Sequence, residues 1–187
     1  MRMLLVAAVF TALWALAPPD FADQDDPRLA RLFHELQSLD QRRSERADEL
    51  QARIWRIWFQ HPGAEMHQAM AQGETALTQQ HYEAAVDAFS RAIELDPGFA
   101  EAWNRRATTY FQIGRYRDSL DDIQRVLALE PRHFGALAGR GLCLRALDRP
   151  AEALEAYKKA LQINPHLEHV YLEIVRLRAQ LGRKGPL

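Results

Sequence analysis

The first apolar stripe of the chain follows a short acidic run that ends at Asp26. With Asp25 or Asp26 as a cap and Pro27 in the first turn, this stripe predicts a helix. Its apolar positions are Leu29, Leu32, Phe33, Leu36 and Leu39. A second stripe predicts a helix over about 45–60, which ends at the break of residues 61–63. Its apolar positions are Leu50, Ile54, Ile57 and Trp58. The polar stretch 40–44 separates the two stripes, so the sequence predicts a helical hairpin.

Beyond residue 65 the apolar pattern repeats with a fixed period. Pro97, Pro131 and Pro165 lie 34 residues apart, and each closes a similar helix-like stretch. Blocks aligned at Met66, Ala100 and Phe134 have mostly small residues at positions 8, 20 and 27 and large apolar residues at position 24. These positions hold Gly73, Ala107 and Gly141; Ala85, Ser119 and Ala153; Ala92, Val126 and Ala160; and Phe89, Ile123 and Tyr157. Small residues suit the places where helices come close, and large ones fill a core.

This pattern resembles the tetratricopeptide repeat (TPR), a helix–turn–helix unit with small residues at positions 8, 20 and 27 and proline at 32. The middle block also has Trp103, Tyr110 and Tyr116 at positions 4, 11 and 17. The resemblance spans residues 66–165 and implies an all-α fold, a right-handed solenoid of the TPR type. It implies first helices at about 66–79, 100–113 and 134–147, and second helices at about 82–95, 116–129 and 150–163. Gly114 falls in a turn between two such helices and suits a left-handed conformation.

Two flanking segments complete the predicted organisation. The hairpin, residues 23–65, matches the second-helix positions faintly, so we expect a degenerate unit that caps the N-terminal end of the solenoid. Three TPR units follow at 66–99, 100–133 and 134–167. Residues 168–187 restart the first-helix phase, with Tyr171 at position 4, and predict a solvating cap helix and a short tail.

The N-terminus predicts export. Arg2 precedes an uncharged stretch, residues 3–17, that is too short for a comfortable membrane span and ends at Pro18-Pro19. We expect a signal peptide over residues 1–22 and a periplasmic location. Cleavage after Ala22 is preferred, whereas cleavage after Ala17 is hindered by Pro18. The alternative is an uncleaved inner-membrane anchor, and only that alternative involves the membrane.

The composition argues against several classes of function. The formal net charge is −1, so no overall field attracts nucleic acid. Cys143 is the only cysteine, which excludes an intramolecular disulfide, and a buried apolar role is expected for it. His166 and His169 share a helical spacing, but no carboxylate or cysteine completes a metal site beside them. The sequence therefore predicts no catalytic residues, no cofactor, no metal and no small-molecule substrate.

The TPR resemblance implies that the first helices line a concave groove. The positions that contact ligands in the family hold, among others, the residues we expect to bind a partner: Met70, Glu74, Asn104, Arg105, Thr108, Phe111, Leu142 and Leu172. Gly135 and Gly139 leave space there, for a ligand backbone or as loose packing. Arg105 is a polar contact for the partner or, alternatively, pairs only with Glu101.

A chaperone-type carboxylate clamp is not expected. Its positions hold Met70, Glu74, Arg105, Gly135 and Gly139, and none of these matches the clamp residues. Trp55 and Trp58 offer a second candidate surface, although packing against the first helix of the first repeat is the simpler interpretation. The sequence thus predicts a non-enzymatic module that binds a protein or peptide in its groove. The alternative is a membrane-tethered assembly factor for an envelope complex.

Overall fold

The structure is a computed structural model, and it describes residues 26–40, 44–61 and 63–183. The predicted signal peptide lies outside these ranges. Within them the chain forms nine helices and no strand. They are α1 Pro27–Ser38, α2 Glu45–Trp58, α3 Ala64–Thr78, α4 Tyr82–Leu95, α5 Ala100–Gln112, α6 Tyr116–Leu129, α7 Phe134–Ala146, α8 Pro150–Ile163 and α9 Glu168–Arg183. The all-α prediction is confirmed, and the helices lie where the repeat pattern placed them.

Local signals explain where the helices begin and turn. Asp26 caps α1 by accepting a hydrogen bond of 2.8 Å from the Arg28 N–H, and Pro27 occupies the first turn. The turns inside the three repeats each hold one residue in the left-handed region. These residues are Gln80, Gly114 and Asp148, with φ of 60°, 75° and 53°. Their spacing equals the sequence period, so one turn geometry recurs three times.

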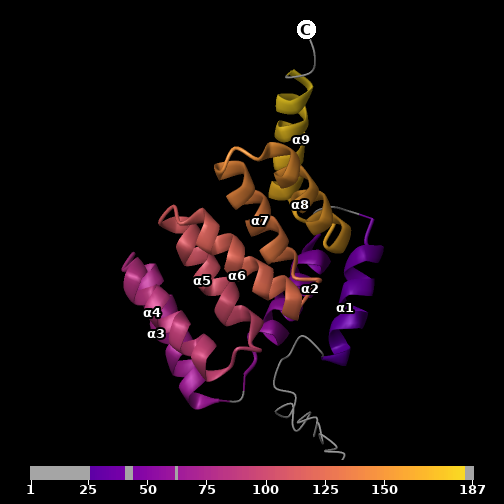
Figure 1. Cartoon of the computed structure of the whole chain (residues 1–187). Coiled ribbons are helices and arrows are strands. Elements are labelled where there is room, and N and C mark those ends of the chain that lie inside the picture. The colour runs from indigo at the N-terminus through magenta and orange to yellow at the C-terminus, as the bar shows by residue number, and fades with distance from the viewer. Residues whose placement is uncertain (1–25, 41–43, 62, 184–187) are drawn as a thin grey trace, which may run out of the picture.

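Three helix pairs, α3/α4, α5/α6 and α7/α8, stack in order along the array (Figure 1). Glycine at position 8 permits the close approach within the first and third pairs. A Cβ on Gly73 would lie 2.4 Å from the Phe89 ring, and a Cβ on Gly141 would lie 2.4 Å from the Tyr157 ring. Ala85 is fully buried in the first pair. At position 8 of the first and third repeats, the glycine therefore makes room for an aromatic ring of the second helix.

The last helix, α9, packs against α8 and ends the array. It buries Val170, Ile174 and Leu177 and leaves its opposite face, including Leu172, exposed. Glu173 accepts a hydrogen bond from Arg145 of α7. The helix therefore behaves as the predicted cap.

The N-terminal hairpin differs from the prediction. Trp55 and Trp58 do not pack on α3; they pack on His133 and Phe134, at the start of α7. Apolar residues of α1 and α2 share one buried cluster with residues of α7, α8 and α9. In Figure 1 the two indigo helices accordingly lie beside the later repeats. Apolar spacing predicted which face of the hairpin is buried. It does not specify which surface of the array covers that face.

The hairpin also contacts the two turns between successive repeats and the turn that joins the third repeat to α9. At the first turn, His61 lies 3.2 Å from Asp96 and edge-on to the Phe99 ring. At the second, Trp58 stacks on His133 with ring centroids 4.3 Å apart. At the third, His166 donates a hydrogen bond of 2.8 Å to the Leu36 carbonyl. Asn164 and Gln51 are also hydrogen-bonded there, at 2.8 Å. The hairpin therefore forms a strap along one edge of the solenoid.

Candidate functional site

The candidate site is a groove formed by three helices, which we call the strap groove. Its floor comes from α5 and α7, and its wall comes from α2. Two adjoining hollows of about 350 and 80 Å³ define it and share Asn104, Thr108 and Gly135. The strap groove is lined by Trp55, Phe59, Asn104, Arg105, Thr108, Phe111, Gly135, Gly139 and Leu142.

Helical spacing brings these side chains together. On α5 the lining residues Asn104, Thr108 and Phe111 are four and three positions apart, which places them on one face. Gly135, Gly139 and Leu142 have the same spacing on α7. Cys143 and Ser119 lie beneath, where the Cys143 thiol is hydrogen-bonded to Ser119 at 3.2 Å. Burial raises the pKa of the Cys143 thiol, so this cysteine is a buried structural group, as its apolar role in the sequence suggested.

The two glycines of α7 have different surroundings. A Cβ on Gly135 would lie 2.8 Å from the Trp55 ring, because the indole occupies the space that the missing side chain leaves. A Cβ on Gly139 would meet only Ile123 Cδ1, at 3.5 Å, which is ordinary contact. The space predicted at these glycines is therefore filled by the hairpin at Gly135 and stays open at Gly139.

A buried polar network supports the wall. Glu101 is fully buried, and its carboxylate accepts hydrogen bonds from His133 Nε2 at 2.7 Å and from Asn104 Nδ2 at 3.1 Å. His133 Nδ1 accepts the Ala136 N–H at 3.0 Å, which places the imidazole proton on Nε2. The same imidazole is stacked on Trp58. The network thus ties α5, α7 and the hairpin together.

Arg105 has two carboxylates and one aromatic ring around it. Its Nε lies 3.0 Å from Glu74 of α3 and 3.8 Å from Glu101, and its guanidinium lies 4.6 Å from the centroid of the Phe59 ring. The alternative pairing with Glu101 is therefore present, and Glu74 adds a closer partner from the neighbouring repeat. A guanidinium with two carboxylates beside it is a poor receptor for a further anionic group.

The structure brings most of the predicted site residues together. Asn104, Thr108, Phe111 and Leu142 line one hollow, and Glu74 contacts Arg105, which lines the adjoining hollow. Met70 is instead buried in the core of the first repeat, and Leu172 is exposed on α9. Sequence reasoning did not place Trp55 and Phe59 in the groove. The spacing of the aromatic residues in α2 could have indicated this position. From the sequence, it indicated only a second binding surface, separate from the groove.

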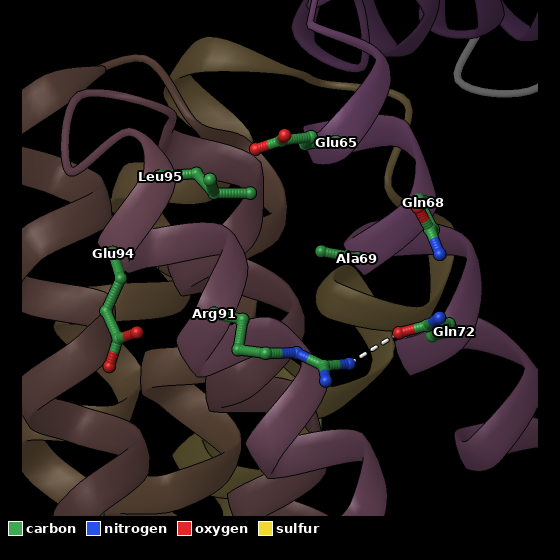
Figure 2. Close-up of a pocket in the computed structure, with 7 residues that line it drawn as sticks. All are labelled: Glu65, Gln68, Ala69, Gln72, Arg91, Glu94 and Leu95. Carbon is green, nitrogen blue, oxygen red and sulfur yellow. Dashed lines mark hydrogen bonds between the residues drawn. The ribbon is translucent and has the colours of Figure 1, made fainter.

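A further hollow, of about 420 Å³, lies between α3 and α4 (Figure 2). Ala69 lies at its base, and a hydrogen bond from Arg91 to Gln72 crosses it. Polar and charged side chains form most of its rim. This is the end of the array that the hairpin was expected to cover.

A metal site and a membrane-spanning helix were also sought in the described part of the chain. No group of three or more His, Cys, Asp or Glu side chains in residues 26–40, 44–61 and 63–183 could hold a metal ion. No helix in the same ranges is long and apolar enough to cross a bilayer.

Comparison with known proteins identifies the family. Residues 70–116 and 104–168 match the tetratricopeptide repeat model. A TPR repeat-containing protein of Rhizobium etli is 37% identical over 138 residues, which are 74% of this chain and 67% of the relative. The small glutamine-rich tetratricopeptide repeat-containing protein 2 of Mycosarcoma maydis is 30% identical over 119 residues, 64% of this chain and 34% of the relative.

Solved structures agree on the fold. The TPR domain of Sgt2 from Aspergillus fumigatus has a TM-score of 0.62 at 19% identity and covers 66% of this chain and 83% of that domain. The first TPR domain of Spaghetti (RPAP3), solved with an HSP90 peptide, has a TM-score of 0.61 at 22% identity and covers 63% and 94%. With three in-phase repeats, a matching family model and a bacterial relative over most of its length, this chain belongs to the tetratricopeptide repeat family.

Proposed function

We propose that this protein is a non-enzymatic protein–protein interaction module that binds a segment of a partner in the strap groove. The open end of the groove supports this proposal most directly. There Phe111, Gly139 and Leu142 form an apolar hollow beside the polar groups of Asn104 and Thr108. An apolar floor with a few fixed polar groups is the usual form of a peptide-binding surface.

The polar groups favour an uncharged segment of backbone. Asn104 uses its amide N–H on Glu101, which leaves its side-chain carbonyl oxygen to accept a hydrogen bond. The Thr108 hydroxyl donates to the Asn104 backbone carbonyl at 2.9 Å and keeps acceptor capacity of its own. Backbone N–H groups of a partner can therefore donate to both, while its apolar side chains rest on Phe111 and Leu142.

An acidic C-terminal peptide fits this groove poorly. One similar structure was solved with an HSP90 peptide. In this chain Met70 is buried at a clamp position, and Arg105 is already paired with Glu74 and Glu101. We therefore propose an apolar protein segment as the ligand, with no role for nucleic acid or a small-molecule substrate.

We further propose that the protein acts in the bacterial periplasm. Arg2 and the uncharged stretch 3–17 support export with removal of residues 1–22. Mass spectrometry of the mature protein tests this directly, and a first residue at Asp23 is expected. Intact Met1 on a soluble cytosolic product would contradict export. Intact Met1 on a membrane-bound form would favour the alternative, a tethered assembly factor.

Site-specific photo-crosslinking tests the binding proposal. A photoreactive residue at Thr108 faces the groove, whereas one at the exposed Asp87 of α4 provides a matched control. In envelope preparations we expect an adduct from position 108 but not from position 87. The adduct should disappear when Gly139→Leu fills the hollow. Equal adducts at both positions, or an adduct that survives Gly139→Leu, would refute groove binding.

A further inference from the structure

The strap groove already holds a segment of this chain at one end. Gly135 and Arg105 lie at positions where the family resemblance places ligand contacts. Trp55 fills the space at Gly135, and Phe59 covers the Arg105 guanidinium. Trp55 lies in the last turn of α2 and Phe59 is the C-cap residue of that helix, four positions further on, so the two rings form one edge of its C-terminal end. The helix therefore sits where a bound helix would sit.

The aromatic edge is not packed on all sides. Trp55 and Phe59 are each only partly buried, and the hollow of about 350 Å³ opens directly beside them. Behind them the Trp58 ring is buried, yet its Nε1–H donates to no acceptor among the described residues. A buried donor without a partner destabilises the closed arrangement, because its hydrogen bond to water is lost and not replaced. Room beside the edge and an unsatisfied group behind it both favour exchange with another segment.

The polar contacts of the strap are also of modest strength. At the third turn Gln37 donates to two backbone carbonyls at 3.2 Å, Asn164 bonds Gln51 at 2.8 Å, and His166 bonds the Leu36 carbonyl at 2.8 Å. The net stabilisation from each such bond is small, because water replaces it on opening. The aromatic edge itself contacts the array through ring contacts of Trp55 with His133 and Phe134 and the cation–π contact of Arg105 with Phe59.

We propose that α2 is an internal, displaceable ligand of the strap groove. The partner that displaces it is an amphipathic helix with aromatic residues four positions apart, as Trp55 and Phe59 are. In the closed state Trp55 fills the space at Gly135, whereas the space at Gly139 stays open. Partner binding replaces the two aromatic rings and extends along the whole groove. This inference rests on the proposed function and adds the class of partner and its regulation.

A synthetic peptide of residues 44–61, labelled with fluorescein, is the probe. It contains α2 with its Ser44 cap, and fluorescence anisotropy measures its binding to the full chain. Against the wild-type chain the internal α2 competes, so binding is weak. In the full-length variant Trp55→Ala that competition is reduced, and we expect the affinity to rise at least tenfold. Arg53→Ala, an exposed change on the same helix, should leave the affinity at the wild-type level.

Two further variants show where the peptide binds. Adding Gly135→Leu to the Trp55→Ala chain places a side chain where the indole was, so the gain in affinity should be lost. A peptide with Trp55→Ala and Phe59→Ala should not bind any of these chains. No rise in affinity for the Trp55→Ala chain, or a rise that persists with Gly135→Leu, would overturn the proposal.

Native-state hydrogen exchange on the wild-type chain gives an independent result that requires no variant. A displaceable strap opens before the array does, so amides of α2 should exchange at least tenfold faster than those of α7 and α8. Equal protection of α2 and α7 would overturn the proposal. Failure of the envelope crosslink at Thr108 alone would refute the proposed function, whereas these two measurements address only the internal ligand.

Discussion

Trp55 of α2 lies against Gly135 of α7 so closely that a Cβ on the glycine would be 2.8 Å from the indole. The two residues are eighty positions apart in the chain. Their contact links the N-terminal hairpin to the concave face of the third repeat. It joins two features that the sequence presented as separate candidates, the aromatic hairpin and the groove.

Alanine substitutions at the two groove glycines should have opposite effects on stability. Gly139→Ala adds a methyl group into open space and should stabilise the protein by about 1 kcal/mol, the usual difference in helix propensity. Gly135→Ala gains the same propensity but forces Trp55 aside, and overpacking of this kind costs about 1–3 kcal/mol. Urea unfolding measures both. Equal stabilisation by the two substitutions would show that Trp55 does not occupy the Gly135 site.

The left-handed turn residues provide a second test. Gln80 and Asp148 adopt φ of 60° and 53°, a conformation that disfavours residues with a Cβ by about 1–2 kcal/mol. Gln80→Gly should therefore stabilise the protein, by up to about 1 kcal/mol after the entropy of glycine is counted. Gly114→Ala should destabilise it, because Gly114 has φ of 75°. Thermal melts of the two variants should shift in opposite directions, and a common direction would contradict the repeated turn geometry.

Tyr157 should make stability depend on pH in alkaline solution. Burial raises the pKa of Tyr157 to about 12, whereas the unfolded side chain ionises near its usual value of about 10. Above pH 10 the unfolded state loses the proton first, so stability falls as the pH rises from 10 to 12. The loss attributable to this group is at most about 3 kcal/mol.

Tyr157→Phe is the matched variant. The Tyr157 hydroxyl is buried and has no hydrogen-bond partner among the described residues, so its removal should leave stability at pH 7 unchanged or slightly higher. Between pH 10 and 12 the variant should lose less stability than the wild type does. The same slope in both proteins would mean that Tyr157 does not titrate from a buried state.

Much of the array could be predicted from the sequence, because the pattern of one structural unit occurs three times in it. The 34-residue period, the closing prolines and the small residues such as Gly73 and Gly141 each have a local physical cause that recurs in phase. Gly114 likewise predicted its turn. Residues that contact each other within a repeat are close in sequence, so the pattern of small and apolar residues is enough to predict their contacts.

The strap could not be predicted in the same way. Ile54 and Ile57 showed which face of α2 is buried, but an apolar stripe does not specify the surface that covers it. Arg105 was expected mainly as a free contact for the partner, and the structure pairs it with Glu74 from the preceding repeat. Both features depend on contacts between segments that no repeat pattern connects.

An intramolecular crosslink tests the central claim most directly. A photoreactive residue in place of Trp55 is activated in the full chain, and the crosslinked tryptic peptides are identified by mass spectrometry. The strap arrangement predicts a crosslink to the peptide 133–140, which contains His133, Phe134 and Gly135. A crosslink to α3, residues 64–78, in place of that peptide would show that the hairpin caps the first repeat and that the groove has no strap.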